Sequence, residues 1–378
     1  MNSKPGASKR GKFRKVEKMS EFIADLLAEP VHFLNENAPG APVAISSRIR
    51  LARNIKNYPF PTAADREAAA EIVELTAMVI KRTKALGKKY WSTDAGALSD
   101  MQKAVLLERH LASRELLNGG FLQALHIACD RTCSVMVNEE DHLRLQSLMP
   151  GLQLEKCFKQ ISKLDDKICS QLDVAYDGTL GYLTASPGNL GTGMKASVML
   201  HLPALAMDGD IKQLENGLAK LGFNIQGMFG EGSQDLGHFY QISNQSTLGE
   251  SEQEIIEHLQ RLVDQIIEQE ESMRLKLLEH RRNDLLDAVG RSYGILKYGY
   301  KISAKEAFQA LSLVRLGVDL KMFSTLDMAN LNELFINISS GHLQHLAGRA
   351  LLEEEEKSYR AQMIREKFKN SSGKNSNS

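Results

Sequence analysis

Two arginines stand two residues apart in segment 44–51, where polar and apolar side chains alternate. Side chains two apart on a strand share a face, so Arg48 and Arg50 are expected to point the same way while Ile49 and Leu51 face a core. Each guanidinium can form two parallel charge-assisted hydrogen bonds with an anion such as a triphosphate. The pair suits a phosphate-binding strand, but taken by itself it fits a solvated basic strand face better.

Three adjacent carboxylates, Glu139, Glu140 and Asp141, stand in a polar turn between the strand patterns 134–137 and 142–148. Carboxylates so close together repel one another, and nothing structural requires them. Such a cluster can hold a cationic substrate, accept a proton or help to position hydrated magnesium. Arg144, just beyond the turn, is placed to reach a phosphate. The alternative is a merely acidic loop.

Two glycine-rich segments follow predicted strands. Segment 186–195 runs toward Lys195, and its glycines permit close backbone approach to an anion. It lacks the spacing of a P-loop or a dinucleotide fingerprint. In segment 226–233, Glu231 lies between two glycines at the end of a strand, where a mobile loop can close a site. An ordinary turn is the alternative for each segment.

The elements that must position these residues fall into two groups. Short strands are predicted at 44–51, 134–137, 142–148, 181–185, 197–202, 224–229 and 238–243, and helical composition is found at 63–86. This mixture indicates an α+β fold, with an antiparallel sheet flanked by helices. Ser251 and Ser303 each begin a predicted capping box, and region 251–366 is almost wholly helical, with breaks expected at Gly290, Gly317 and Gly341.

The chain of 378 residues has 47 basic and 47 acidic side chains, but this balance is a cancellation. Residues 1–20 hold seven basic side chains and one acid, and residues 21–366 carry a net charge of −9. No apolar run approaches the roughly 18 residues that span a bilayer, and no secretory signal is present. Four cysteines in so long a chain make no disulfide framework. We therefore expect a reduced cytoplasmic protein with neither a membrane nor a nucleic-acid partner.

The order and wording of these segments resemble the phosphagen kinase (ATP:guanido phosphotransferase) superfamily, and specifically its bacterial protein arginine kinase branch (McsB type). The matching stretches are 46–54, 138–144, 196–205 and 240–252, and the resemblance covers about residues 21–366. It implies phosphoryl transfer from Mg-ATP to a guanidinium nitrogen of an arginine side chain in a protein. ATP and Mg2+ are the implied cofactors, and no metal-ligating residues are predicted.

The resemblance also implies the site residues. Glu140 and Glu231 would grip the substrate guanidinium, and Glu140 would accept its proton. The implied nucleotide contacts are Ser46, Ser47, Arg48, Ile49, Arg50, His110, Arg144, Lys195, Ala196, Ser197, Val198, Met199, Gln226, Gly227, Met228, Phe229, Gly230 and Glu231.

Four segments are predicted on this basis. They are a disordered basic tail (1–20), a phosphagen kinase catalytic domain (21–274), a helical dimerisation domain (275–366) and a second disordered tail (367–378). Only 45 residues precede Ser46, whereas small-metabolite members have a helical domain there, which favours a protein-borne arginine. The implied partners are proteins with exposed arginines, a second copy of the chain, a zinc-finger activator (McsA type) and the Clp protease system, in a stress response.

The chain departs from the family pattern at several positions. Ser186 replaces the usual site cysteine, Lys195 replaces an arginine and loses the bidentate fork, and Gln226 replaces another arginine and loses the charge. Stretch 356–361 keeps only the last two residues of a phosphoarginine-binding motif, so we expect that regulatory pocket to be lost or weakened. The alternative function is a weak or inactive kinase homologue that acts as an ATP-binding adaptor.

Overall fold

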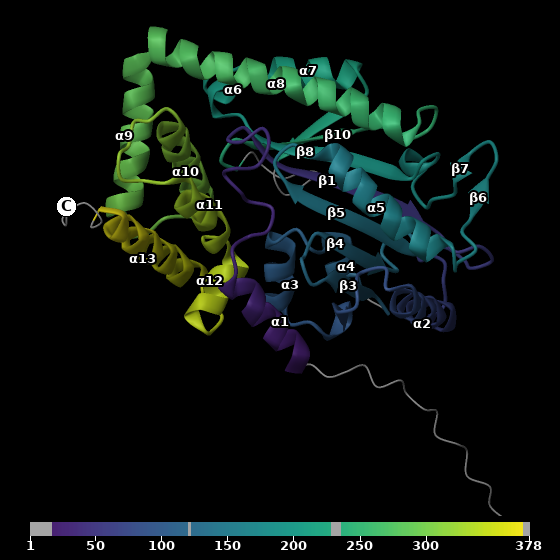
Figure 1. Cartoon of the computed structure of the whole chain (residues 1–378). Helices are drawn as coiled ribbons and strands as arrows, with labels where there is room; N and C mark the ends of the chain where they lie inside the picture. Colours follow the sequence, from purple (N-terminus) through teal and green to yellow (C-terminus); the bar gives the residue numbers. More distant parts are fainter. Residues whose placement is uncertain (1–16, 120–121, 228–235, 373–378) are drawn as a thin grey trace, which may run out of the picture.

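An eight-stranded sheet forms the centre of the computed structural model, which describes residues 17–119, 122–227 and 236–372 (Figure 1). In spatial order its strands are β2 (Tyr90–Asp94), β3 (Ala124–Ala128), β4 (Cys133–Val137), β5 (Leu143–Pro150), β1 (Ala44–Arg53), β8 (Met194–His201), β10 (Phe239–Asn244) and β9 (Phe223–Gly227). Every neighbouring pair is antiparallel, which confirms the predicted α+β class. A small hairpin, β6 (Tyr176–Asp177) and β7 (Gly181–Tyr182), stands apart.

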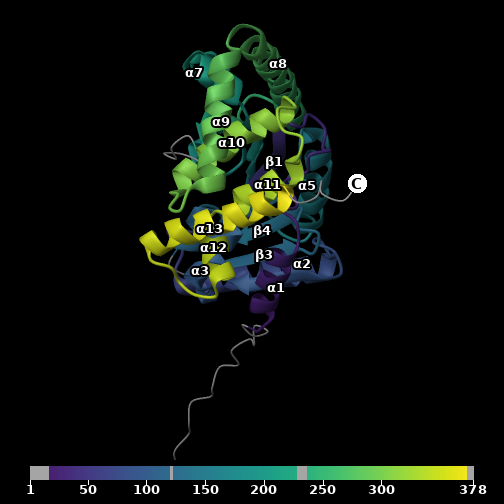
Figure 2. The ribbon, with the colours of Figure 1, turned by 90° about the vertical axis from the view of Figure 1, so that its left-hand side faces the viewer.

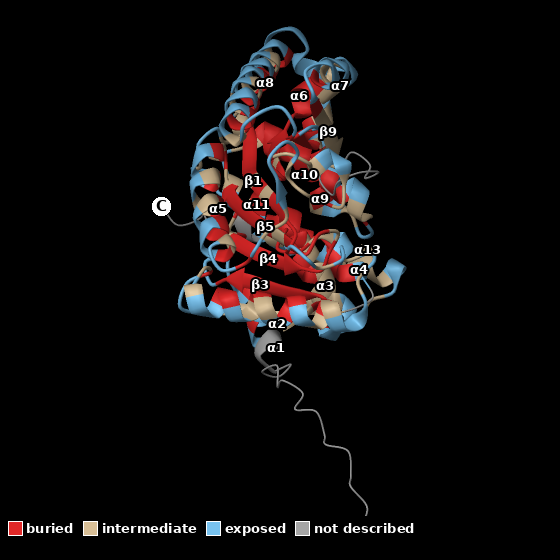
Figure 3. Cartoon of the chain, turned by 90° about the vertical axis from the view of Figure 1, so that its right-hand side faces the viewer, coloured by how far each residue is buried: buried red, intermediate tan, exposed pale blue. Residues whose placement is uncertain are grey.

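One face of the sheet is apolar and fully covered. Ile49, Leu145 and Val198 point to this face, and they share one core with helices α2 (Arg66–Thr83), α5 (Leu154–Cys169) and α8 (Glu252–His280). The strands are accordingly buried while the outer helix surfaces are exposed (Figure 3). The alternation of apolar and polar residues along β1 thus assigns its arginines to the opposite face.

The opposite face is covered at two places and open between them. Helices α1 (Glu17–Ala28), α3 (Asp100–Glu108) and α4 (Arg114–Asn118) pack in one core with β3 and β4. Helices of the C-terminal region share a second core with Ile45, Met199 and Phe239 of the sheet. The middle of this face, between the two covers, is where the polar side chains of the strands gather.

The C-terminal region is helical, as predicted, and lies at one side of the sheet (Figure 1, Figure 2). After α8 it consists of α9 (Arg282–Tyr298), α10 (Ala304–Asp319), α11 (Met328–Asn337), α12 (Ser340–Ala347) and α13 (Glu353–Ser372). Two short helices, α6 (Pro203–Asp208) and α7 (Ile211–Lys220), precede β9. Ser251 caps α8 in a complete capping box, and the Ser303 side chain caps α10.

The predicted helix breaks at Gly290 and Gly317 need correction. Helix α9 runs through Gly290, and the chain breaks at Arg281 instead, while Gly317 lies inside α10. A glycine costs a helix only about 1 kcal/mol, which packing compensates; at Gly317 a Cβ would lie 2.7 Å from Phe323 and Val289. The predicted domain boundary at 274 falls within α8.

Residues 17–20 and 367–372, which were predicted to belong to disordered tails, are helical. Helix α1 begins at Glu17 because it buries Phe22, Ile23 and Leu26. Helix α13 continues to Ser372 and buries Phe368. Among the described residues, no helix is both long enough and apolar enough to cross a membrane.

Candidate active site

Strand register places the predicted basic residues side by side on the open face of the sheet. Arg50 of β1 lies opposite Gln146 of β5 on one side and Lys195 of β8 on the other. Arg144 lies opposite Ala52, two residues further along β1. Because side chains alternate along each strand, one central face therefore collects Arg48, Arg50, Arg144 and Lys195.

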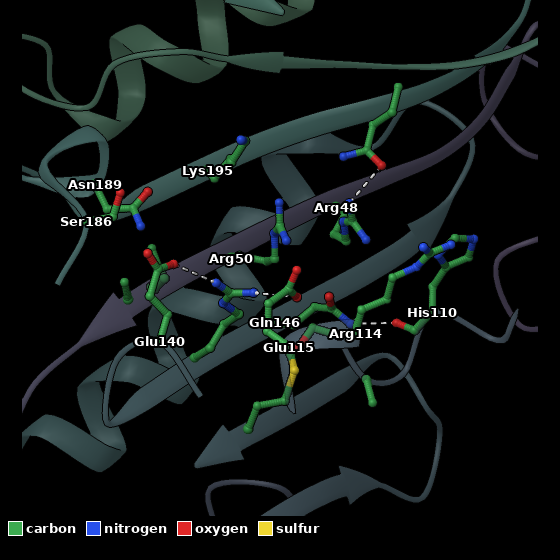
Figure 4. A pocket seen from close by; sticks show the side chains of 18 of the residues that line it. Arg48, Arg50, His110, Arg114, Glu115, Glu140, Gln146, Ser186, Asn189 and Lys195 are labelled. Atoms are coloured by element: carbon green, nitrogen blue, oxygen red, sulfur yellow. Dashed lines mark hydrogen bonds and ion pairs between the residues drawn. The ribbon is translucent and has the colours of Figure 1, made fainter. Parts of the chain in front are cut away.

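These residues line a cavity of about 410 Å³ (Figure 4). Its walls come from strands β1, β4, β5, β8, β9 and β10, from the acidic turn, from the glycine-rich segment and from the end of α3 through the start of α4. The lining residues that bear on the chemistry are Arg48, Arg50, His110, Arg114, Glu115, Glu140, Arg144, Gln146, Ser186, Asn189, Lys195, Gln226 and Gln241. A smaller hollow of about 10 Å³ is lined by Ser46, Ser197 and Met199 as well as Arg48 and His110.

The cavity floor is electropositive, and burial disfavours the charged form of its two arginines. Burial, and after it the charge of the neighbouring Arg144, lowers the pKa of Arg48 to about 10. Burial, then Arg48 and Arg144, lowers the pKa of Arg50 well below its usual range. Arg48 donates to Gln241 Oε1 at 2.8 Å, whereas Arg50 Nε has no hydrogen-bond partner among the described residues. Buried cations with unused donors are suited to a polyanion.

Carboxylates surround Arg144 at the opposite side of the cavity. Arg144 Nη1 lies 2.6 Å from Glu139 Oε1 and 4.0 Å from Glu115 Oε2, and Nη2 lies 3.4 Å from Glu140 Oε2. The Glu139 side chain is fully buried and also accepts from the Ser113 hydroxyl, so it is a structural partner of Arg144. The Glu140 side chain is 41% exposed and faces the cavity. Of the three residues in the turn, Glu140 is the one that a substrate can reach.

The surroundings of Glu140 make its carboxyl group a weaker acid than an ordinary glutamate. Burial raises its pKa, opposed by Arg144 and reinforced by the carboxylates of Asp141, Glu139 and Glu115. A raised pKa makes the carboxylate a better proton acceptor once it is ionised. The exposure and the proton affinity of Glu140 both fit a general base.

Asp141 connects the acidic turn to the glycine-rich segment. Its Oδ1 accepts from Asn54 Nδ2 at 2.6 Å and from the backbone N–H of Ala185 at 2.7 Å. Ala185 directly precedes Ser186 at the cavity wall. Asp141 is itself almost fully buried, so it positions two walls of the cavity without lining it.

His110 enters the cavity from the turn after α3. Its backbone is left-handed, with φ of 54°, and its carbonyl oxygen accepts from Gln146 Nε2 at 2.8 Å. Burial, with Arg48 and His32 contributing, lowers the pKa of His110 to about 3. The imidazole is therefore neutral at physiological pH and suits an uncharged part of a ligand.

The structure brings together most, but not all, of the predicted site residues. Arg48, Arg50, His110, Glu140, Arg144, Lys195 and Gln226 line the cavity, and Ser46, Ser197 and Met199 line the hollow beside it. Ser47, Ile49, Ala196 and Val198 are buried and line neither, because they alternate with the cavity residues along β1 and β8. Gly227 ends β9 and lines neither as well. Met228, Phe229, Gly230 and Glu231 lie outside the described residues.

Some cavity residues were not predicted. Gln146 follows Arg144 by two positions on β5, so strand alternation alone could have identified it. Gln241 depends on the pairing of β10 with β8, which brings it near Arg48 across 193 residues of chain. Arg114 and Glu115 come from a five-residue helix with no distinctive motif. Among the departures from the family pattern, Ser186, Lys195 and Gln226 all line the cavity.

Stretch 356–361, which departs from the family's phosphoarginine-binding motif, lies elsewhere, on α13. The Glu356 carboxylate contacts Arg360 Nη2 at 3.3 Å and accepts from the Ser340 hydroxyl. Arg360 is buried and also donates to the carbonyl oxygens of Ile338 and Ile302. An acidic side chain of the protein itself thus pairs with the arginine that the motif retains.

The fold is that of guanidino-compound kinases. A duplicated taurocyamine kinase from Schistosoma mansoni superposes with a TM-score of 0.57 at 22% identity, over 68% of this chain and 39% of that one. A lombricine kinase superposes with a TM-score of 0.54 at 23% identity, over 65% of this chain and 70% of that one. A family model described as ATP:guanido phosphotransferase, C-terminal catalytic domain, matches residues 71–273.

Curated relatives narrow the class further. A protein-arginine kinase of Halothermothrix orenii is 42% identical over 88% of this chain and 95% of its own length. A protein-arginine kinase of Pelotomaculum thermopropionicum is 39% identical over 90% of this chain and 96% of its own length. Residues 282–378 match the model described as Protein-arginine kinase McsB C-terminal domain. The chain therefore belongs to the protein-arginine kinase family of ATP:guanido phosphotransferases, as the sequence motifs indicated.

Proposed function

We propose that this protein transfers the γ-phosphoryl group of Mg-ATP to a guanidinium nitrogen of arginine side chains in proteins. The observation that carries the proposal is the placement of the half-exposed Glu140 carboxylate at a cavity whose floor holds the buried Arg48 and Arg50. The cationic guanidinium acceptor would lie against the Glu140 carboxylate, and the anionic phosphates of ATP would lie against Arg48 and Arg50. Family membership supports the same reaction.

The chemistry needs both halves of this arrangement. A guanidinium is protonated and its lone pairs are delocalised, so it is a poor nucleophile until a base orients it and takes a proton. In the proposed reaction the nitrogen–phosphorus bond forms as the bond from the γ-phosphorus to ADP breaks, and Glu140 receives the proton. Arg48, Arg50, Arg144 and Lys195 neutralise the charge of the phosphates.

The residues present fit a nucleoside triphosphate. Arg50 Nε has no hydrogen-bond partner in the described part of the chain, and Arg48 and Arg50 carry like charges. An anion would stabilise both features. The described part of the chain gathers no group of three or more His, Cys, Asp or Glu side chains around a metal position. Mg2+ would enter with the nucleotide as Mg-ATP, where it would neutralise charge on the phosphates.

The position of Arg144 suggests an order in which the two substrates bind. It contacts Glu140 at 3.4 Å, so its guanidinium lies against the carboxylate that the substrate guanidinium needs. A phosphate that attracts Arg144 would weaken this contact and leave Glu140 free for the acceptor. Binding of nucleotide is therefore expected to favour binding of the protein arginine.

A labelling experiment tests the function. The full chain is incubated with Mg-ATP and an arginine-rich protein, and phosphoarginine is measured by mass spectrometry. Glu140→Gln should reduce the rate by about 10²- to 10⁴-fold, the usual contribution of a general base, while ATP binding measured by calorimetry is retained. Glu271→Gln, at an exposed position of α8, is the matched control.

An adaptor function makes the opposite prediction. If the wild-type chain yields no more phosphoarginine than Glu140→Gln, with an activator supplied, the kinase proposal is rejected. Retained ATP binding in that case would favour an ATP-binding adaptor. The cytoplasmic location, the role in a stress response, the homodimer, the zinc-finger activator and the Clp system remain proposals that rest on the family resemblance.

A further inference from the structure

We propose that His342, a residue of the C-terminal helical region, is a positioning residue for the nucleotide. Through Glu108 and Arg109 it holds His110 in the active-site cavity. The inference rests on the proposed function, because it assigns ATP to that cavity. According to this inference, both the sheet region and the C-terminal helical region shape the nucleotide site, although 232 positions separate His110 from His342.

His342 is fully buried near the start of α12, where α12 packs against the end of α3. Its Nδ1 lies 2.5 Å from Glu108 Oε2, and Arg109 Nε donates to its Nε2 at 3.1 Å. A guanidinium can only donate, so Nε2 must accept and the proton must be on Nδ1, which donates to Glu108. Burial lowers the pKa of His342, which agrees with a neutral ring.

Glu108 joins the two helices by more than this one bond. Its carboxylate accepts the backbone N–H of Gly341 at 2.7 Å and that of His342 at 3.1 Å. A Cβ at position 341 would lie 2.7 Å from Ala104 Cβ and 2.9 Å from Glu108 Oε2. The absence of a side chain at Gly341 therefore permits a separation of α3 and α12 at which the carboxylate can reach the backbone of α12.

Arg109 extends the same network toward the N-terminal segment. It is 2% exposed, and its Nη1 and Nη2 each donate to the carbonyl oxygen of Glu29 at 3.2 Å. Its backbone N–H donates to the carbonyl oxygen of Val105 at 3.0 Å, and Arg109 is the residue that caps the C-terminus of α3. The residue that precedes His110 is thus fixed through its side chain and through its backbone.

His110 leaves this anchored segment in a left-handed turn and reaches the cavity. Its ring lies edge-on to Phe33, with centroids 5.0 Å apart, and Phe33 packs in one cluster with Ile336 of α11. The C-terminal region therefore supports His110 twice, by hydrogen bonds through α12 and by apolar packing through α11. Release of the α12 anchor is expected to shift His110 while leaving the catalytic carboxylate on its own turn.

Two substitutions of His342 separate hydrogen bonding from shape. In His342→Gln the amide nitrogen can donate to Glu108 and the amide oxygen can accept from Arg109, whereas His342→Leu can do neither. His345→Gln, on the same helix and partly exposed, is the matched control. ATP affinity is measured by calorimetry on the full chain, together with KM for ATP and kcat for protein arginine phosphorylation.

His342→Leu should raise the dissociation constant and KM for ATP on the order of tenfold, because it leaves buried donors and acceptors unpaired. Its kcat should stay within about threefold of the wild type, since the base is untouched. His342→Gln should restore most of the ATP affinity, and His345→Gln should match the wild type. A purely structural role would lower stability without this split between KM and kcat.

A folded His342→Leu variant that binds ATP like the wild type would overturn the inference, as would a loss of kcat at unchanged ATP affinity. If circular dichroism shows that this variant does not fold, Glu108→Gln takes its place. It should weaken ATP binding severalfold, and an unchanged affinity would be equally decisive against the inference. A wild-type chain that binds no ATP would instead reject the proposed function, and the inference with it.

Discussion

Arg48 and Arg50 are buried cations that the surrounding protein stabilises only in part. Burial and the charges of neighbouring arginines lower the pKa of both side chains, and Arg50 Nε is unpaired among the described residues. Replacing buried charges with apolar groups of similar volume is often neutral or stabilising. We therefore expect the two buried arginines to lower the stability of the nucleotide-free protein, and an anion bound in the cavity to restore it.

Substitution of Arg50 tests this trade-off. Arg50→Met should unfold at a temperature equal to or a few degrees above the wild type when no nucleotide is present, since about 1 kcal/mol corresponds to roughly 2–4 °C in a domain of 150–250 residues. The stabilisation by Mg-ATP should largely disappear. Thermal denaturation with and without Mg-ATP measures both effects. Arg291→Met, at an exposed position of α9, is the control, and a clear loss of stability in nucleotide-free Arg50→Met would contradict the prediction.

The raised pKa of Glu140 predicts how stability depends on pH. A carboxyl group whose pKa is higher in the folded state is destabilising when ionised, and this cost disappears as the pH falls below the unfolded value of about 4.5. Glu140→Gln should therefore be more stable than the wild type at pH 8, by a margin that shrinks toward pH 4. Melting curves across this range measure the margin. A margin that grows on acidification would show that the Arg144 contact outweighs burial.

At the scale of elements, the end of β1 is attached to α5 and to the wall of the cavity. Arg53 Nη2 lies 2.7 Å from Asp165 Oδ2, and Nη1 donates to the Thr192 carbonyl oxygen at 3.0 Å. The Tyr182 ring of β7 lies 3.4 Å from the Arg53 guanidinium carbon. One buried arginine thus connects a strand, a helix, a hairpin and the glycine-rich segment.

This ion pair should be strongly coupled. Asp165→Leu leaves a buried arginine unpaired and should lower the free energy of unfolding by about 3–5 kcal/mol, whereas Arg53→Met with Asp165→Leu should recover most of that loss. Denaturant titration of both single variants and the double variant measures the coupling. Additive losses would mean that solvent already compensates the charge of Arg53.

At the scale of the whole molecule, the sheet and the C-terminal helical region are not independent bodies. Ile45, Met199 and Phe239 of the sheet share a core with Phe308 and Phe335 of the C-terminal helices. A buried polar network also joins the sheet to the C-terminal helices. His201 Nε2 lies 2.8 Å from the Ser312 hydroxyl oxygen, and His201 Nδ1 lies 2.7 Å from Arg315 Nη1. Separate unfolding of either region would expose apolar surface and unpaired polar groups of the other.

We therefore expect one cooperative unfolding transition for the full chain. Calorimetry should give a van't Hoff enthalpy equal to the measured enthalpy. Phe335→Ala should lower the melting temperature of that single transition, because a buried phenylalanine contributes on the order of 3–5 kcal/mol. Two resolved transitions in the wild type would contradict the prediction, and Leu346→Ala, at an exposed position of α12, provides the control.

The sequence by itself determined the features that depend on local periodicity and on short motifs. Alternation along 44–51 assigned Arg48 and Arg50 to one face, the Ser251 capping box marked the start of α8, and the acidic turn marked Glu140. These features could be predicted because neighbouring residues decide which way a strand faces and where a helix begins.

Only the tertiary structure decided which distant groups meet. It brought Gln241 to Arg48 and His342 to Glu108, and it carried α9 through Gly290, where local propensity favoured a break. The physical reason is that strand register and helix packing are set by complementary shape and buried polar pairing across the whole chain, which no local pattern contains.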